Sequence, residues 1–231
     1  MPIWSPGMYT LQSYGDRVTT INTQVSYVPQ GKGLFPWMTL RDNVELPLKI
    51  ARTPAAERAR RAAEWIRLVE LEGFEDRYPR QLSGGMEKRG SLARALIADR
   101  PVSLMDEPFG ALDAQTKTQM QEWLMQLWAD FKKTVVFVTH DVDEAILLAD
   151  RILLMSNGPR AVIAEMVINT LPADRTRHNM HHDPQFYRIR NHLVDFLVNR
   201  SKDLQAKGSA GQFDGYEPVL VCPGLQTPVT Q

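Results

Sequence analysis

The sequence is poor in cysteine, has no net charge and contains no long apolar run, and each absence excludes a class of protein. Cys222 is the only cysteine among 231 residues, which excludes an internal disulfide framework and a thiolate metal site and fits a reducing cytosol. Lys and Arg together number 27, as do Asp and Glu, so the whole chain is neither a polybasic nucleic-acid binder nor an acidic disordered tail.

Membrane insertion and secretion are not expected either. No apolar stretch approaches the ~20 residues that span a bilayer. Residues 1–14 show no basic segment followed by an apolar run, so we expect no signal peptide. Because 43% of the residues are hydrophobic, the chain can bury one sizeable core. We therefore expect a soluble intracellular protein.

Strand and helix patterns alternate from residue 25 onward. Thr53 suits a helix N-cap, Pro54 the first helical position and Gly73 a C-terminal stop. The alternation predicts an α/β domain with a mostly parallel sheet. The expected strands are 25–28, 102–105, 135–139 and 151–155, and the expected helices are 54–72, 86–100, 114–132 and 144–148. The runs at 102–105 and 135–139 are mostly apolar, which is typical of buried strands.

The two ends of the chain are less regular. Residues 1–24 are rich in turn formers and receive no assignment. A basic run precedes Pro184, and either a solvated connector or an anion site fits it: Arg175, Arg177, His178, His181 and His182. A helix with one apolar face follows, which carries Phe186, Ile189, Leu193, Phe196 and Leu197. From residue 208 the chain is rich in Gly, Pro and Thr, and we expect a disordered tail over 203–231.

Two carboxylates follow the apolar run at 102–105. One of the pair Asp106-Glu107 can hold Mg²⁺, and the other can polarise a water molecule for phosphoryl transfer. A pair of solvated acids that cap a turn fits the same spacing. His140 ends the run at 135–139, at the edge where parallel sheets bind ligands, although a structural histidine is the commoner case.

A glycine pair opens the helix expected after residue 85. Ser83-Gly84-Gly85 offers a hydroxyl, backbone N–H groups and the positive end of a helix dipole to an anion. Two glycines before a helix are also common in ordinary turns, so the segment alone decides nothing.

Together, these segments resemble the ATP-binding subunits of ABC transporters. LSGGM at 82–86 is similar to the signature motif of that family, LMDEPFGALD at 104–113 to its Walker B strand and D-loop, and VTHD at 138–141 to its switch-histidine segment. VPQ at 28–30 resembles the Q-loop, and 34–39 resembles the segment that follows it in importers. The order and spacing of four motifs make the resemblance highly specific.

The resemblance implies an ABC-type P-loop NTPase-like domain, with a parallel sheet core and a helical signature subdomain, that hydrolyses ATP with Mg²⁺. Glu107 is then the general base, Asp106 and Gln30 contact Mg²⁺, and Gln30 and His140 sense the γ-phosphate. The remaining residues implied in nucleotide binding and communication across a dimer are Ser83, Gly84, Gly85 and Asp113.

The resemblance covers about residues 25–202. It implies an ATPase domain over 25–170, with its helical subdomain at about 40–100, and a helical extension over 171–202. Within the group that serves nitrate, sulfonates and taurine, the segment 183–197 is similar to nitrate-type subunits. The implied partners are a second ATP-binding subunit, a transmembrane permease and, indirectly, a substrate-binding protein, with no nucleic acid. The implied location is peripheral, on the cytoplasmic face of the membrane.

The phosphate-binding loop of the family, G-x₄-G-K-S/T, has no counterpart in the sequence. The only Gly-Lys pair, Gly31-Lys32, lies after the Q-loop glutamine and is followed by Gly33. The segment 1–24 is too short for the opening strand, the loop and its helix, so we expect an N-terminally incomplete domain that binds ATP poorly in its own site.

Two further positions depart from the family pattern. The family usually has glutamine at the position of Lys88 and an apolar residue at that of Gly90. We interpret both as tolerated variation on an exposed helix face. Phe35 and Trp37 fall in the segment that contacts the permease in the family, and filling of the local core is the other interpretation of this aromatic pair.

Three alternatives to an ATP-hydrolysing importer subunit stay open. The chain can be a non-hydrolysing partner that donates only its signature segment to a complete subunit, or a fragment without function. A non-transport ABC ATPase that acts on DNA or ribosomes is disfavoured by the zero net charge and by the importer-like segment. The sequence does not fix the transported substrate.

Overall fold

The computed structural model describes residues 12–13, 16–17, 24–31, 33–110, 112–131, 133–157, 161–200 and 218–223. The chain forms two compact units. The first consists of Met1–Thr116 and Phe131–Phe137, and the second of Lys117–Asp130 and Val138–Gln231. No helix that the structure describes is long and apolar enough to cross a membrane.

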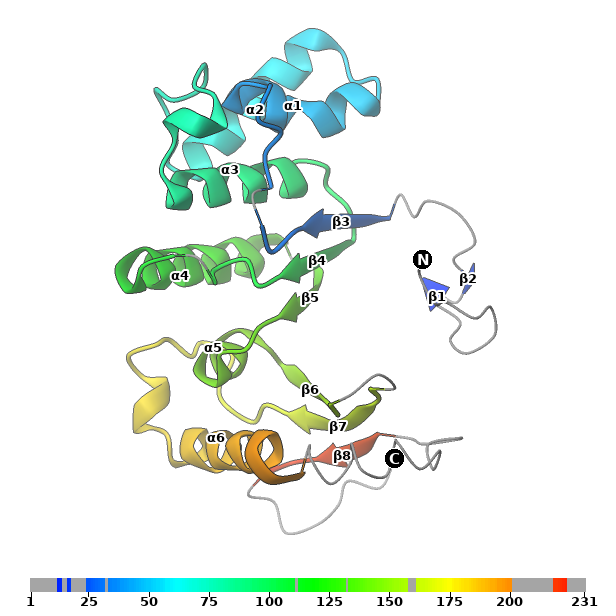
Figure 1. Ribbon diagram of the computed structural model, residues 1–231, viewed down its shortest axis with the longest axis vertical. Helices are drawn as coiled ribbons and strands as arrows, with labels where there is room; N and C mark the ends of the chain where they lie inside the picture. The colour runs from blue at the N-terminus through cyan, green and yellow to red at the C-terminus, as the bar shows by residue number, and fades with distance from the viewer. Residues whose placement is uncertain are drawn as a thin grey trace. The chain divides into compact units, whose positions relative to one another are not determined.

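The first unit contains a three-stranded sheet with the order β3-β4-β5 (Figure 1). β3 (Val25–Val28) and β4 (Val102–Asp106) run parallel, and β5 spans Thr134–Val138. Parallel strands need a long crossover connection, and the chain between β3 and β4 supplies it with helices. The predicted α/β class with parallel strands is thus confirmed. A short antiparallel pair, β1 (Gln12–Ser13) and β2 (Asp16–Arg17), precedes the sheet in sequence.

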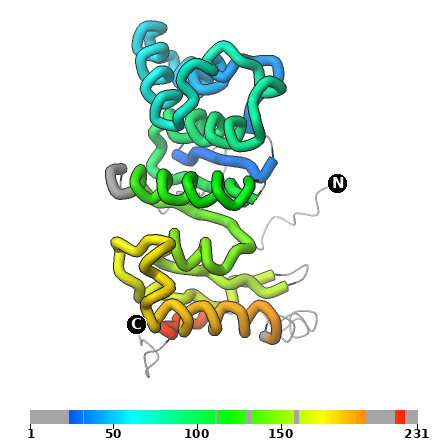
Figure 2. Tube along the Cα trace, turned by 90° about the vertical axis from the view of Figure 1, so that its left-hand side faces the viewer, coloured from blue at the N-terminus to red at the C-terminus, as the bar shows by residue number. Residues whose placement is uncertain are grey.

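The crossover carries four helical segments: α1 (Leu40–Ile50), α2 (Ala55–Leu68), the 3-10 turn η1 (Pro79–Gln81) and α3 (Gly84–Leu96). Figures 1 and 2 show α3 between the pair α1 and α2 and the sheet. The side chain of Thr39 caps α1 by accepting a hydrogen bond from the Asp42 amide at 3.1 Å. α3 thus lies where it can contact both the sheet and the other helices.

The ends of α2 differ from the expectation. Pro54, not Thr53, is the N-cap, and no side chain caps the helix there. At the other end, Glu70 takes the left-handed conformation with φ of 57°, and the amide of Leu71 donates to the Ile66 carbonyl at 2.9 Å. This arrangement closes the helix several residues before Gly73, with a non-glycine residue in the position that glycine usually takes.

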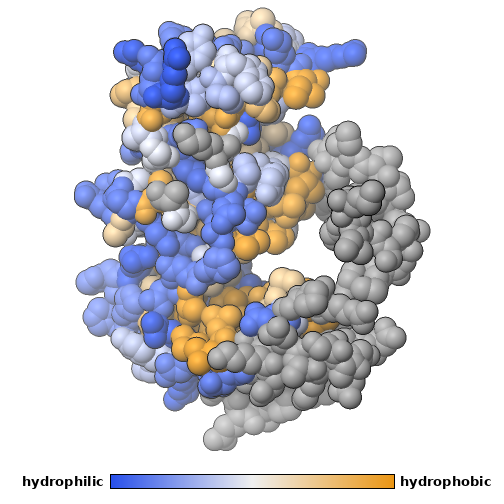
Figure 3. Space-filling view, viewed as in Figure 1, coloured by the Kyte–Doolittle hydropathy of each residue, from blue (hydrophilic) through white to orange (hydrophobic). Residues whose placement is uncertain are grey.

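The apolar runs predicted strands that are buried on both faces. In the structure, the strands of the first sheet are buried on one face only. Tyr27, Leu104 and Val136 are 54%, 36% and 46% exposed, whereas their strand neighbours Ser26, Ser103 and Met105 are buried. An orange patch in Figure 3 shows apolar residues gathered on one side of the molecule. In the part of the chain that the structure describes, this face of the sheet is left uncovered, which gives the strands the alternation of a half-buried sheet.

The second unit contains α4 (Ala114–Phe131) for most of its length, α5 (Val142–Leu148) and a second three-stranded sheet. Its strands are β6 (Arg151–Met155), β7 (Ile163–Ile168) and β8 (Val219–Val221), in the order β6-β7-β8. β6 and β7 are antiparallel, and β7 and β8 are parallel. The expectation of a disordered tail over 203–231 is therefore wrong at 218–223, and the other residues of that tail lie outside the described ranges.

A C-terminal helical segment packs on the second sheet. It comprises η2 (Met180–His182), α6 (Pro184–Asp195) and the π-helical turn η3 (Phe196–Arg200). Asp183 caps α6 by accepting from the Gln185 amide at 2.8 Å, and Pro184 takes the first helical position. Four of the five residues expected on the apolar face are buried, and Leu197, in the turn after α6, is exposed.

Candidate functional site

The carboxyl ends of β3 and β4 bring three of the predicted site residues together. Because the two strands are parallel and in register, the residues that follow them lie at one edge of the sheet. There the Gln30 side chain donates from Nε2 to Oε2 of Glu107 at 2.9 Å. Beside them, Oδ2 of Asp106 accepts a hydrogen bond from the Tyr27 hydroxyl at 3.3 Å. The two carboxylates are therefore oriented by partners from β3 and its end rather than free to rotate.

The backbone of Glu107 is strained. Its φ of 42° lies in the left-handed region, which costs a non-glycine residue about 1–2 kcal/mol. The amide of Gly110 donates to the Glu107 carbonyl at 3.2 Å and closes the turn. Strain of this kind persists only where surrounding contacts enforce it, and it is found at functional sites. The turn fixes the direction in which the Glu107 carboxylate leaves the strand.

The predicted glycine pair forms the first turn of α3. Ser83 is the N-cap, and its Oγ accepts a hydrogen bond from the Met86 amide at 3.2 Å. A Cβ atom on Gly84 would meet nothing within 4 Å, so the backbone there is open to a ligand. A Cβ on Gly85 would lie 3.1 Å from Cγ2 of Thr116, so this glycine permits a close approach within the unit. The open N-terminus of a helix of 13 residues suits an anion.

Asp113 is engaged at the start of α4. Its carboxylate accepts hydrogen bonds from the Thr116 hydroxyl at 2.6 Å and from the Thr116 amide at 3.0 Å. These hydrogen bonds hold the pKa of Asp113 below its usual value. The close approach of Gly85 to Thr116 places the start of α3 beside this capping group. Its role in communication across a dimer stays a prediction.

His140 lies in the second unit, directly after β5, and is exposed. The loop around it is fixed by its neighbours. Asp141 caps α5 by accepting from the Glu144 amide at 3.1 Å, and the ammonium group of Lys117 lies 2.8 Å from Oδ2 of Asp141. Burial raises the pKa of Asp141, but the hydrogen bond from Lys117 outweighs it together with the other contacts, so the pKa is held below its usual value.

The buried carboxylate of Glu144 also stabilises the loop around His140. Glu144 is 2% exposed, and its carboxylate lies 3.2 Å from the Lys117 ammonium. It also accepts from the Gln121 side chain at 2.6 Å and from the Thr139 hydroxyl. A buried charge is tolerated only when it is paired and hydrogen-bonded, as this one is. The network thereby ties α4 to the residues on both sides of His140.

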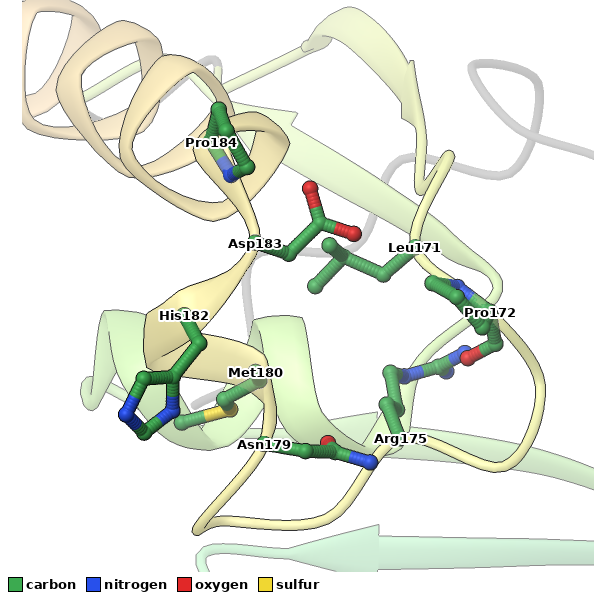
Figure 4. Close-up of a pocket in the computed structure, with 8 residues that line it drawn as sticks. All are labelled: Leu171, Pro172, Arg175, Asn179, Met180, His182, Asp183 and Pro184. Carbon is green, nitrogen blue, oxygen red and sulfur yellow. The ribbon is translucent and has the colours of Figure 1, made fainter.

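Within the basic run before Pro184, Arg175 fits neither of the two expectations. Arg175 is buried, and its guanidinium donates to backbone carbonyls at the end of α5, to Leu147 at 2.8 Å and to Ala149 at 2.9 Å. Arg175 borders a cavity of about 400 Å³, where it also donates to the carbonyl of the neighbouring Pro172 at 3.2 Å (Figure 4). Because its donors are used to cap α5, Arg175 supplies no anion site and is no solvated connector.

The residues at the β3–β4 edge suit Mg²⁺ only in company with a phosphate ligand. Among the described residues, no three His, Cys, Asp or Glu side chains lie together so as to hold a metal ion. Mg²⁺ is commonly held by one or two carboxylates together with water and substrate phosphates. Asp106 and Gln30 fit such a partial set, and the two remain predicted metal contacts.

Sequence reasoning missed three residues that contact this machinery. Tyr27 supports Asp106, Lys117 supports the His140 loop, and Lys88 is bound to the backbone around Gln30. Lys88 was interpreted as a residue of an exposed helix face because charge normally indicates exposure. The one available signal was the departure of Lys88 from the family pattern.

A family model described as "ABC transporter" matches residues 7–110. The match begins within the segment 1–24, to which the sequence analysis gave no assignment. The chain is 40% identical over 198 residues to the bicarbonate transport ATP-binding protein CmpD of Synechocystis sp.. The aligned residues cover 85% of this chain and 70% of that protein. It is 38% identical over 204 residues to the nitrate import ATP-binding protein NrtD of the same organism, and this alignment covers 86% of this chain and 76% of NrtD. The similarity therefore does not single out nitrate.

Solved structures agree with the sequence relatives. The dimeric, post-hydrolysis structure of the ATP-binding cassette MJ0796, bound to ADP and Pi, superposes with a TM-score of 0.51 at 39% identity. The superposition covers 56% of this chain and 57% of that one. The shared part thus spans little more than half of the solved cassette.

Replacing Lys117 with Met should make stability at neutral pH fall and should flatten its pH dependence. The pKa of Asp141 is held below its usual value, so the ion pair stabilises the fold above about pH 4 and is lost as the pH falls through the lowered pKa. The wild-type chain should exceed Lys117→Met in Tm by roughly 2–4 °C between about pH 5 and 8, with the gap narrowing below about pH 4.

Thermal unfolding followed by circular dichroism over that pH range checks this expectation. Lys49→Met, at an exposed lysine of α1, is the control and should leave the pH profile unchanged. A gap between wild type and Lys117→Met that stays constant down to the most acidic pH would show that the Lys117–Asp141 pair does not generate it.

Proposed function

Because the chain belongs to the ATP-binding proteins of ABC transporters, we propose that it hydrolyses ATP to energise an importer of nitrate or a similar small anion, such as bicarbonate. The observation that carries the proposal is the hydrogen bond of 2.9 Å between Gln30 and Glu107, next to Asp106 at the edge of the first sheet. The relatives named for bicarbonate and nitrate supply the class of cargo, and specificity for one anion resides in other subunits.

Each residue of this edge has a distinct task in the proposal. Glu107 accepts the proton of the attacking water, and the strained turn aims its carboxylate. Asp106 and Gln30 contact the Mg²⁺ that accompanies the nucleotide, which supplies charge neutralisation when bound. His140 lies at the end of β5 and contacts the γ-phosphate, on a loop that the Lys117 network holds in place.

The open start of α3 serves the nucleotide of a second subunit. Ser83, Gly84 and Gly85 present a hydroxyl and unobstructed backbone N–H groups to a phosphate. The 231 residues contain no G-x₄-G-K-S/T sequence, so the phosphate contacts of that motif have to come from outside them. The open first turn of α3 also supports a second candidate function, in which the chain donates only its signature segment to a complete partner.

The other proposed partners follow from importer function. A permease in the membrane receives the energy of hydrolysis, a substrate-binding protein delivers the anion to it, and the chain sits peripherally on the cytoplasmic face. Trp37 is 68% exposed and lies 5.2 Å from Phe35, ring centroid to centroid. A tryptophan so exposed does not fill a core, so the aromatic pair is proposed as the permease contact.

Glu107→Gln tests the proposal in the complete transporter that contains the chain. The amide keeps the shape of the side chain but cannot accept the proton, so kcat for ATP hydrolysis should fall by ~10² or more while ATP binding persists. Glu72→Gln, at an exposed carboxylate of the same unit, should hydrolyse ATP at the wild-type rate.

Ser83→Arg separates the two candidate functions in the same assay. If the chain only donates its signature segment, Ser83→Arg should abolish hydrolysis, and Glu107→Gln should leave it intact. Wild-type hydrolysis in Glu107→Gln would therefore contradict the proposed function and favour the donor.

Trp37→Ala should weaken association with the permease by about tenfold or more, as loss of a tryptophan anchor does, because its ring is exposed in the chain alone. The Tm of the isolated chain should stay unchanged. Co-purification with the permease and thermal unfolding are the two measurements, with Phe74→Ala, at a phenylalanine that is 40% exposed, as the control. A large fall in Tm with unaltered association would instead place Trp37 in the core.

A further inference from the structure

Lys88 is a buried lysine, not the exposed helix residue that the sequence analysis expected. Only 6% of it is exposed, although it lies on α3 just after the glycine pair. Gly90, the other departure from the family pattern, is buried as well. The interpretation of both as variation on an exposed face is therefore wrong. Lysine is almost never fully buried without partners, so its surroundings call for a specific role.

The partners of Lys88 are three consecutive backbone carbonyls at the end of β3. Its ammonium nitrogen lies 3.0 Å from the carbonyl oxygen of Pro29, 2.6 Å from that of Gln30 and 3.1 Å from that of Gly31. An ammonium group has three N–H donors and no acceptor, so the three carbonyls saturate it. These hydrogen bonds involve a charged donor and are stronger than those between neutral groups.

The electrostatic surroundings of Lys88 favour its charged form only in part. Burial lowers the pKa of Lys88, whereas the negative charges of Asp106, Glu87 and Glu107 act in the opposite direction, and burial prevails. The carboxylates of the candidate site oppose the desolvation of Lys88, and the three carbonyl partners suit the three donors of an ammonium group. The Lys88 side chain that donates to the Gln30 carbonyl thus also lies within electrostatic reach of Asp106 and Glu107.

The same stretch of chain packs on α3 without spare room. A Cβ atom on Gly33 would lie 1.8 Å from Oγ and 2.6 Å from Cβ of Ser91, and one on Gly90 would lie 3.1 Å from Cδ1 of Leu34. α3 and the residues after β3 therefore approach closely at both glycines. Lys88 secures the polar side of this contact, and the glycines allow the apolar side.

Gln30 connects the lysine to the chemistry. Its carbonyl accepts the shortest of the three hydrogen bonds from Lys88, and its side chain donates to Glu107. A displaced Gln30 backbone would carry the side chain away from Glu107. A misplacement of about 1 Å in such a group can cost ~10²-fold in rate.

We propose that Lys88 is a positioning residue, which clamps the backbone of Pro29–Gly31 to α3 and thereby sets the place of the Gln30 side chain beside Glu107. The helix that begins with Ser83 and the Q-loop of the same chain then move as one piece. The proposal rests on the proposed function only for its effect on hydrolysis, because the clamp itself exists without nucleotide.

The test begins with the isotope-labelled full chain in the absence of nucleotide. Lys88→Met keeps a long apolar stem but removes all three donors. The ¹⁵N order parameters of the Gln30 and Gly31 amides should fall from about 0.85, typical of a rigid backbone, to below about 0.6. The Phe35 amide, which donates to the buried Asn43 side chain at 2.7 Å, should stay rigid. Lys88→Gln, with two amide donors, should show the same loss to a smaller extent and serves if Lys88→Met does not fold.

Two further measurements complete the test. Lys133→Met, which removes a lysine paired with Asp99 at 2.5 Å in the same unit, is the matched control and should leave Gln30 and Gly31 rigid. In the complete transporter, Lys88→Met should lower kcat for ATP about tenfold or more and change KM less, since Gln30 is misplaced while the proposed contacts of Asp106 and His140 to the nucleotide remain.

Three results would overturn the proposal. One is rigid Gln30 and Gly31 amides in Lys88→Met, and another is a loss of rigidity that extends equally over α1, which would mark a general loss of packing. The third is a wild-type kcat in a transporter whose Lys88→Met subunit has lost rigidity at Gln30. If the wild-type transporter hydrolyses no ATP, the proposed function fails, while the order parameters still decide whether the clamp exists.

Discussion

The parallel pairing of β3 and β4 is the constraint on which the candidate site depends. Strands in this register end at the same edge, so Gln30 after one strand meets Glu107 after the other, although 77 positions separate them in the sequence. The strained turn at Glu107 and the Tyr27 contact to Asp106 refine this edge, but neither would place the carboxylates without the pairing. The crossover between the strands carries α3, and hence the proposed phosphate contacts of its first turn, back to the same sheet.

α3 serves the site at two places along its length. Ser83 and Gly84 are exposed at the start of α3. About one turn later, the Lys88 side chain points inward and donates to the backbone carbonyl of Gln30. A nucleotide that binds the open turn therefore acts on a helix already fixed to the Q-loop. The chain continues from that loop to Trp37 within a few residues, which gives the hydrolytic edge a short route to the proposed permease contact.

Local sequence patterns sufficed to predict most residues of the candidate site. The motifs around Ser83, Asp106 and His140 are contiguous, and an apolar run that ends in acids indicates a strand end without knowledge of its neighbours. The burial of Lys88 was not predicted, because its partners lie 57–59 positions away and because a charged residue on a helix is normally exposed. β8 was not predicted for a similar reason. Its composition resembles that of a disordered tail, and it becomes a strand only by pairing with β7, more than 50 positions earlier.

In the proposed function, ATP hydrolysis at the β3–β4 edge drives uptake of a small anion. Proteoliposomes that contain the permease, the binding protein and this chain test it most directly, with uptake of isotope-labelled nitrate and bicarbonate measured alongside release of phosphate. We predict that one of the two anions accumulates only with ATP on the side of this chain, and that its binding protein raises phosphate release. Accumulation that is equal with and without ATP, or phosphate release that is indifferent to both anions, would contradict the account.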